Sequence, residues 1–193
     1  MLSKQWNLNL DLPTTFSFSH SDVFYKEKEQ CGLFSNFSAC PIKTKNPHIT
    51  LLTSEALYQI LRYSDKPHIQ QEIISQKSPM AAKMKSKKYY KETADNWENI
   101  KVETMIFAIW QKFVQNEIFR VALNISQNPI VERSRKDTFW GAKLHEENQT
   151  LTGVNVLGQI LDKFKKNKAN HLTLSAFPIK KWKILNVPVA ELF

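Results

Sequence analysis

The sequence predicts a mainly α-helical domain with a small β element, a fold of the α+β class. Two observations lead to this prediction. Apolar residues recur at helical spacing in several stretches after residue 53, often behind a residue that caps helices, whereas apolar and polar residues alternate in segments near the two ends. The 193 residues are enough for one substantial hydrophobic core, so a single compact domain is expected.

Five helices are expected, and most show an apolar stripe, a capping residue or both. They lie after a cap at Thr53 or Ser54, after Ser78-Pro79, from Trp97 to about Gln115 behind Asn96 or Asp95, over Ile118, Val121, Ala122 and Ile125, and from about Val156 to Lys165. Before residue 26, the segments TFSFSH and DVFY alternate and predict a short pair of strands. The C-terminal segment HLTLSAFPIKKWKILNVPV is expected to pack on the domain as an extension.

The composition indicates a globular protein without a membrane span. With 42% hydrophobic and 11% aromatic residues, the chain is too apolar for a disordered protein. It has no run of about 18 apolar residues that could cross a bilayer, and its first 13 residues lack the apolar core of a secretory signal. A cytoplasmic location is therefore expected.

Positive charge is in excess. The 27 lysines and arginines outnumber the 18 aspartates and glutamates and give a formal net charge of +9, which favours phosphate-bearing partners. Much of the excess lies in two runs, Lys83 to Lys91 and Lys163 to Lys168. Each run could equally be a solvated helix end, where the helix dipole favours cations.

Cysteine and histidine show no metal-binding pattern. Cys31 and Cys40 form no pair with metal-ligand spacing, and the five histidines are scattered. Reduced thiols and a reaction that needs neither a metal nor a cofactor are expected.

Two groups of polar residues are candidates for chemistry. Glu55, Gln59 and Arg62 fall at i, i+4 and i+7 of the first helix, either as an exposed polar stripe or as a carboxylate that faces a cleft between an amide and a cation. Asp137 precedes the aromatic pair Phe139 and Trp140, where it could be an acid with a raised pKa or the cap of a turn.

Seven segments together resemble the NADAR family, in the family's order and at similar spacing. They are FYKEKEQCGLFSNFSACPI (24–42), TSEALYQ (53–59), SPMAAKM (78–84), NWENIKVETM (96–105), KFVQN (112–116), DTFWG (137–141) and GVNVLG (153–158). The resemblance implies a single YbiA-like domain over residues 24–168, with an N-terminal extension at 1–23 and a C-terminal extension at 169–193.

The resemblance also implies an N-glycosidase, which hydrolyses a bond between a ribose carbon and a nitrogen. Two substrate classes are associated with the family: small phosphoribosylated intermediates of riboflavin biosynthesis, and ADP-ribose attached to guanine in nucleic acid. Members with the second substrate can act as antitoxins to an ADP-ribosyltransferase toxin, and the positive charge favours this class. The alternatives of another kind are a module that binds ADP-ribose or nucleic acid without cleaving it, and a partner that blocks a toxin by contact.

Carried over by motif, the resemblance implies active-site roles for Glu55, Trp97 and Asp137. One carboxylate is expected to orient or activate water, and the other to hold the ribose hydroxyls or assist the leaving nitrogen. The residues expected to bind ligand are Gly32, Asn36, Gln59, Arg62, Trp140, Gly141 and Asn155. Ala56 and Arg62 depart from the family, which commonly has histidine and lysine there. Arg62 can still bind phosphate, but it cannot act as a neutral amine.

Overall fold

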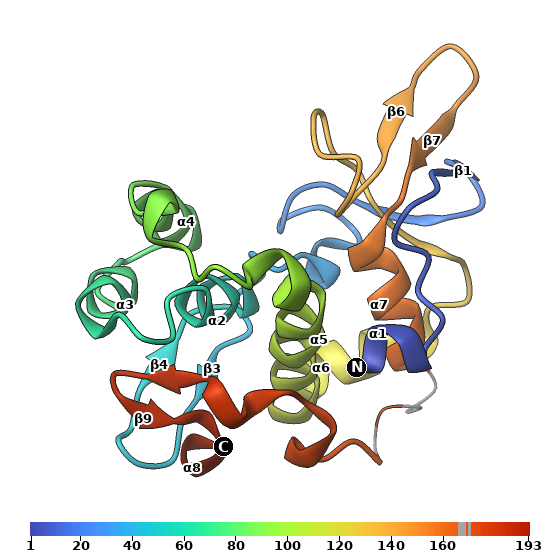
Figure 1. Ribbon diagram of the computed structural model, residues 1–193. Coiled ribbons are helices and arrows are strands. Elements are labelled where there is room, and N and C mark those ends of the chain that lie inside the picture. Colours follow the sequence, from blue (N-terminus) through green and yellow to red (C-terminus); the bar gives the residue numbers. More distant parts are fainter. Residues whose placement is uncertain (166–168, 170) are drawn as a thin grey trace. The chain divides into compact units, whose positions relative to one another are not determined.

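The computed structural model describes residues 1–165, 169 and 171–193 (Figure 1). It contains two compact units: unit 1 comprises residues 1–2, 39–116 and 172–193, and unit 2 comprises residues 3–38 and 117–171. Helices predominate over strands of two to four residues in the described chain, so the predicted mainly α class with a small β element is confirmed. None of the helices described is both long and apolar enough to cross a bilayer.

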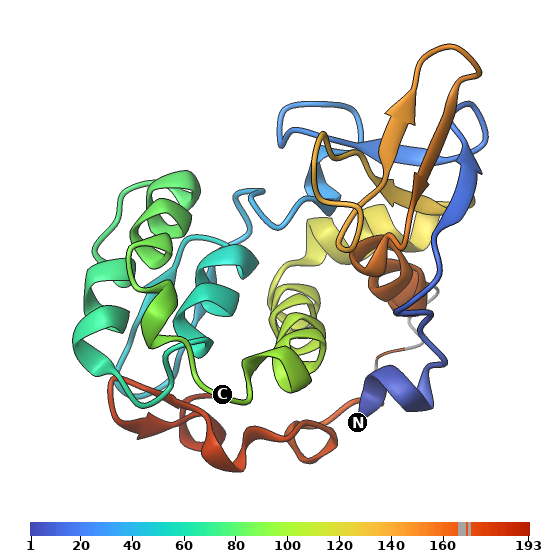
Figure 2. The ribbon, with the colours of Figure 1, turned by 45° about the horizontal axis from the view of Figure 1, so that its top comes forward.

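Unit 1 is organised around α2 (Ser54–Leu61), which packs against α3, α4 and α5. Figures 1 and 2 show α2, α3 and α4 side by side. Every residue of α2 is buried, including its polar ones. The other elements of unit 1 are β3 (Ile42–Lys43), β4 (Thr50–Leu51), α3 (Pro67–Ile74), α4 (Pro79–Lys87), η2 (Tyr90–Glu92), α5 (Trp97–Gln115), η4 (Leu174–Ala176), η5 (Ile179–Lys181), β8 (Lys183–Ile184), β9 (Val187–Pro188) and α8 (Val189–Leu192).

Side-chain caps begin two of these helices, as the sequence predicts. The hydroxyl of Thr53 accepts a hydrogen bond from the backbone N–H of Ala56, and the hydroxyl of Ser78 accepts one from Ala81, both at 3.2 Å. Helix α5 runs over the predicted residues 97–115. Asn96 lies at its N-cap position, but the Asn96 side chain makes no capping hydrogen bond there.

Unit 2 holds a three-stranded sheet in the order β1-β7-β6 and a separate two-stranded sheet of β2 and β5. The buried side chains of Val131, Ala142 and Leu151 form one of its hydrophobic clusters. Its elements are β1 (Thr14–Ser17), β2 (Asp22–Phe24), η1 (Gly32–Phe34), α6 (Glu117–Ile125), β5 (Ile130–Glu132), β6 (Lys143–His145), β7 (Thr150–Gly153) and α7 (Val156–Phe164), with most of α1 (Leu2–Gln5).

The predicted strand pair before residue 26 is wrong in its pairing. Both strands form, but β1 pairs antiparallel with β7, and β2 pairs in parallel with β5. The physical reason is that local alternation reports a strand that is buried on one face, whereas its partner is chosen by packing with distant segments. The pairing thus brings residues before 26 onto the segment 130–153.

Helix α6 confirms the predicted fourth helix but exposes most of its predicted apolar stripe. Ile118, Val121 and Ile125 are exposed, whereas Phe119 and Leu123 are fully buried. The inward face of the helix therefore lies one position away from the stripe that the sequence indicates.

Segments near both ends of the chain are held by long-range hydrogen bonds to side-chain amides. Near the N-terminus, the amide of Gln159 exchanges two hydrogen bonds with the backbone of Asn9, at 2.8 and 2.9 Å. Near the C-terminus, the amide of Gln70 donates to the carbonyl of Lys183 at 2.8 Å and accepts from the N–H of Leu185 at 2.7 Å. The predicted boundary at residue 168 and part of the basic run 163–168 lie outside the described residues.

Candidate active site

Glu55 is a buried carboxylate held between an amide and an ammonium group. Its side chain lies on the first turn of α2 and is almost fully buried, with 3% of the residue exposed. Oε1 accepts a hydrogen bond from Nε2 of Gln59 at 2.9 Å and lies 3.5 Å from Nζ of Lys83 on α4. The interpretation of these residues as an exposed polar stripe is therefore wrong, because packing of α3, α4 and α5 around α2 covers this face.

A chain of hydrogen bonds orients the amide that contacts Glu55. The hydroxyl of Ser86 donates to Oε1 of Gln59 at 2.6 Å, and the hydroxyl of Tyr63 donates to the carbonyl of Ser86 at 2.8 Å. Lys83 and Ser86 are three residues apart on α4, so that helix directs both side chains toward α2. The amide of Gln59 thus has a defined direction, with its NH₂ group toward the carboxylate.

Arg62 lies against two aromatic rings of unit 1. Its guanidinium carbon is 4.7 Å from the ring centroid of Trp97 and 4.8 Å from that of Tyr90. Tyr58 packs on Trp97 with a centroid distance of 5.1 Å. Burial, partly opposed by the nearby Arg62, raises the pKa of Tyr58, so its phenol is neutral at physiological pH. The result is an aromatic and cationic wall that begins one turn after Gln59.

Two buried donors in this wall have no acceptor. Nε of Arg62 and Nε1 of Trp97 are shielded from solvent and make no hydrogen bond within the described residues. Buried polar atoms are nearly always hydrogen-bonded in native proteins, and each exception calls for an explanation such as a ligand or water. Nε1 of Trp110 is a third such donor, and for the two donors in this wall a ligand oxygen is one explanation.

Asp137 is an exposed turn cap in unit 2. Its Oδ1 accepts hydrogen bonds from the backbone N–H groups of Phe139 at 3.1 Å and Trp140 at 2.9 Å. Its own N–H donates to the hydroxyl of Ser134 at 2.9 Å. The capping interpretation of Asp137 is therefore confirmed by geometry, and any catalytic role must act from this exposed position.

Asn155 and Gly141 join the loop after β5 to helix α7. The buried amide of Asn155 donates to the carbonyl of Ile130 at 2.9 Å and accepts from the N–H of Glu132 at 3.1 Å. A Cβ atom on Gly141 would lie 2.5 Å from the carbonyl oxygen of Glu132, so only glycine fits this close backbone approach. Both residues have a structural role in addition to any contact with ligand.

The first N–H groups of α7 are used within unit 2. The N–H groups of Val156 and Leu157 donate to the carbonyls of Phe139 and Trp140, at 3.0 and 3.1 Å. Phe139 and Trp140 form an edge-to-face pair with a centroid distance of 5.1 Å. Trp140 is therefore fixed through its backbone, and its half-buried ring remains a candidate surface for a base.

Gly32 and Asn36 lie at a tight turn of unit 2. A Cβ atom on Gly32 would lie 2.0 Å from the carbonyl oxygen of Glu27, which excludes any other residue there without a backbone shift. None of the four glycines has a positive φ, so close approach is what they share. Asn36 is buried, with 5% exposed.

The predicted site residues form two groups. Glu55, Gln59, Arg62 and Trp97 come together in unit 1, and the remaining predicted residues belong to unit 2. The sequence did not single out Lys83, Ser86, Tyr58 or Tyr90, although the helical spacing of Lys83 and Ser86 behind the Ser78 cap is a signal that they share a face.

No group of three or more potential metal ligands is found among residues 1–165, 169 and 171–193. Cys31 and Cys40 are free thiols.

The site combines a buried, oriented carboxylate, a cation and an aromatic wall. Such a site is typical of proteins that act on polar, oxygen-rich ligands. Residues 23–167 match the NADAR domain, and the chain belongs to the NADAR family. It is 32% identical over 147 residues to N-glycosidase YbiA of Escherichia coli K12, which covers 76% of this chain and 87% of that protein.

Two further comparisons bear on the fold and on the family. The NMR structure of E. coli YbiA matches with a TM-score of 0.63 and 30% sequence identity, covering 78% of this chain and 86% of that one. A riboflavin biosynthesis protein of Vibrio vulnificus is 28% identical over 149 residues, 77% of this chain but 38% of the longer protein. The mainly helical YbiA fold implied by the resemblance is confirmed.

Proposed function

We propose that this protein is a metal-independent N-glycosidase that removes ADP-ribose from guanine in nucleic acid. The observation that carries the proposal is the buried carboxylate of Glu55, fixed by Gln59 and Lys83 in a NADAR protein with relatives named N-glycosidases. Such hydrolysis adds water to the ribose carbon, breaks its bond to the guanine nitrogen, and leaves a proton on that nitrogen.

Glu55 acts on the water. Because Oε1 is engaged by Gln59 and Lys83, we assign Oε2 to the reacting water. The carboxylate can accept a proton from water or stabilise positive charge on the ribose carbon. Gln59 keeps the carboxylate in one orientation, which limits the reorganisation needed in the transition state.

Arg62 and Trp97 bind the oxygen-rich part of the substrate. Their unsatisfied N–H groups lie in the same wall, and a phosphate or ribose oxygen is an acceptor for both. For Asp137 the role rests on its family motif alone: with Oδ1 engaged as a cap, Oδ2 is the oxygen that we assign to the ribose hydroxyls or the leaving nitrogen.

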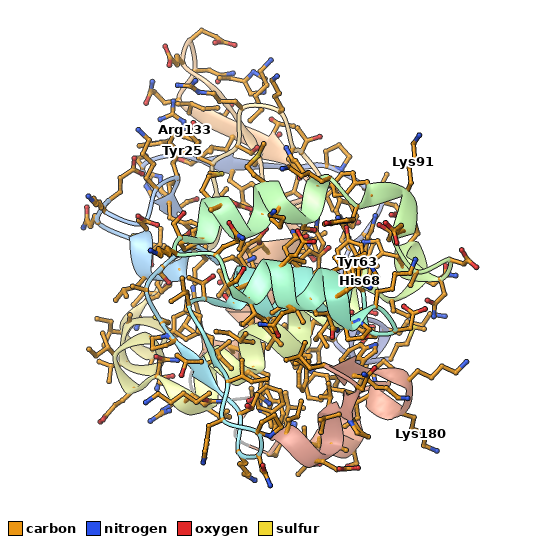
Figure 3. The ribbon with its side chains drawn as sticks, turned by 90° about the vertical axis from the view of Figure 1, so that its left-hand side faces the viewer. Tyr25, Tyr63, His68, Lys91, Arg133 and Lys180 are labelled. Atoms are coloured by element: carbon orange, nitrogen blue, oxygen red, sulfur yellow. The ribbon has the colours of Figure 1, made fainter. Side chains whose placement is uncertain are left out.

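The choice of a nucleic-acid substrate is supported by exposed cations. Within the run 83–91, Lys83 pairs with Glu55 and Lys85 pairs with Glu72 at 3.1 Å, while Lys87, Lys88 and Lys91 are exposed. Figure 3 shows Lys91 extending away from the helices. A polynucleotide uses such an outer basic surface, whereas a small sugar phosphate needs cations only inside the pocket. An antitoxin function against an ADP-ribosyltransferase follows from this substrate.

A second candidate substrate class is the phosphoribosylated intermediates of riboflavin biosynthesis, favoured by the name of the V. vulnificus relative. A non-catalytic binding module is disfavoured, because a binder of phosphates gains nothing from a buried carboxylate beside its cations.

A competition assay tests the proposal. A guanine-ADP-ribosylated oligonucleotide and the phosphoribosylated riboflavin intermediates are offered to the protein in excess chelator, and kcat/KM is measured for each over a salt series. We expect faster cleavage of the oligonucleotide, weakened by salt and unaffected by the chelator. Faster cleavage of the small intermediates favours the second candidate, and a strict need for a divalent ion contradicts the mechanism.

A further inference from the structure

Three cations gather around Tyr25 in unit 2, apart from the residues assigned above. The distances to the centroid of the Tyr25 ring are 5.3 Å from Cζ of Arg133, 5.7 Å from Nζ of Lys26 and 5.9 Å from Cζ of Arg135. Figure 3 shows Tyr25 and Arg133 side by side. These four residues are called the Tyr25 cluster below.

The backbone of the parallel sheet builds the cluster. Strands β2 and β5 pair in parallel with Phe24 opposite Glu132, and Tyr25 and Arg133 are the residues that directly follow the two strands. The N–H of Arg133 donates to the carbonyl of Phe24 at 2.7 Å, which extends the pairing to the base of the cluster. Since parallel strands leave a sheet at the same edge, the side chains that follow them are brought together by the fold.

The carboxylate nearest to the cluster contacts its backbone and not its cationic side chains. In the described part of the chain, no carboxylate forms an ion pair with Lys26, Arg133 or Arg135. Glu29 is the acid that contacts this segment, and its Oε2 accepts from the backbone N–H groups of Tyr25 and Lys26 at 3.2 and 3.3 Å. Three cations about one ring repel one another, and an anion placed among them would relieve that repulsion.

We propose that Tyr25, Lys26, Arg133 and Arg135 bind the phosphodiester backbone of the nucleic-acid strand that carries the modified guanine. The proposal rests on the proposed function and extends it to a second contact with the substrate. Guanidinium groups form bidentate hydrogen bonds with phosphate oxygens. The ring of Tyr25 holds the guanidinium groups in place.

The loop that contains the arginines continues directly to the proposed active-site loop. Ser134, between the two arginines, accepts a hydrogen bond from the N–H of Asp137 at 2.9 Å. Lys26 and Arg135 are exposed and Tyr25 and Arg133 are half-buried, as a strand passing over the surface requires. The arginines that hold the phosphate therefore lie within four residues of Asp137, the carboxylate that we assign to the ribose.

The main experiment uses the double variant Arg133→Gln/Arg135→Gln. Binding of an unmodified single-stranded oligonucleotide is measured over a salt series, together with kcat/KM on an ADP-ribosylated oligonucleotide and on ADP-ribosylated guanosine. We expect about tenfold weaker binding and a salt slope smaller by about 1.4, since each phosphate contact with a single strand contributes about 0.7. Cleavage of the oligonucleotide should fall by a similar factor, and cleavage of the guanosine should stay unchanged.

Matched variants separate the cluster from general charge and from folding. Lys4→Gln/Lys45→Gln removes two exposed cations outside the cluster and should change binding by less than about threefold. Tyr25→Phe keeps the ring and should bind normally, whereas Tyr25→Ala should weaken binding several-fold because the guanidinium groups lose their support.

Equal losses on the oligonucleotide and on the guanosine would overturn the proposal, because the arginines would then hold the pyrophosphate of ADP-ribose. An unchanged salt slope would overturn it as well. If the unaltered protein cleaves neither substrate, the proposed function fails, and binding of the oligonucleotide that depends on Arg133 and Arg135 still supports the cluster as a nucleic-acid site.

Discussion

Glu55 in unit 1 and Asp137 in unit 2 are both acids of family motifs, yet they differ in burial and in their hydrogen-bond partners. Glu55 is 3% exposed and lies beside an ammonium group and an amide. Asp137 is exposed, and backbone N–H groups are its partners. Burial with a cation favours reactivity, because electrostatic interactions strengthen away from water. The exposure of Asp137 and its two backbone contacts favour a structural role as a turn cap. Such a cap can also contribute to an active site.

The largest expected effect is that of Glu55→Gln. The amide removes the negative charge that accepts a proton or stabilises the ribose cation, so kcat should fall by about a thousandfold or more. The control is Glu72→Gln, since Glu72 also pairs with a lysine of α4 but is assigned no chemistry. Steady-state kinetics and circular dichroism check the result, and a Glu55→Gln variant with near-normal kcat would remove Glu55 from the mechanism.

Asp137→Asn sharpens the comparison, because asparagine keeps the capping oxygen but loses the charge. If Asp137 has a chemical role, kcat should fall by about a hundredfold while stability changes by less than about 0.5 kcal/mol. Asp137→Ala should lose both activity and about 1 kcal/mol of stability. Chemical denaturation and kinetics on both variants measure this. Normal turnover of Asp137→Asn would show that Asp137 is only a cap.

Lys83→Gln tests the cation beside Glu55. Loss of the ammonium weakens the electrostatic support of the carboxylate, and we expect kcat to fall by about tenfold, which is about 1.4 kcal/mol. The control is Lys85→Gln, two residues after Lys83, which breaks the ion pair between Lys85 and Glu72. It should leave kcat within about twofold. If the two variants behave alike, the position of Lys83 next to Glu55 has no catalytic effect.

The smallest expected effect concerns a buried cation of unit 1 and its dependence on pH. Burial lowers the pKa of Lys112 in the folded protein to about 7, with a small opposing influence of Cys40. Between pH 7 and the ordinary lysine pKa, the unfolded chain holds this proton and the folded protein releases it, so stability should rise with pH, by about 1 kcal/mol from pH 7 to 8. Below pH 7 both states are protonated, and this contribution should be constant.

Urea denaturation of the unaltered protein and of Lys112→Met between pH 6 and 9 checks this dependence. The variant should lack the rise, because methionine fills a similar volume without titrating. Equal slopes in the two proteins would show that another group is responsible.

Helix positions in this protein could be predicted from local sequence. The caps at Thr53 and Ser78 and the bounds of α5 from Trp97 to Gln115 follow from hydrogen bonds and periodicity within a few residues. The family could also be identified from short motifs in order. These features depend on neighbours in the chain, which a sequence displays directly.

Strand pairing and burial depended on the tertiary structure. Nothing local to TFSFSH or DVFY indicates that β1 pairs with β7 and β2 with β5, because each partner lies more than a hundred residues away. The placement of Lys83 beside Glu55 likewise arises from the packing of α4 on α2.

The sequence by itself therefore determined most of the longer helices, though not α3, together with the family and most of the residue types of the site. The tertiary structure decided which of two similar acids is buried, which lysine accompanies it, and that Tyr25 meets Arg133 at the end of a parallel strand pair. The physical reason is range: hydrogen bonds within a helix or turn join residues up to four positions apart, whereas burial and charge pairing depend on segments that only the folded chain brings together.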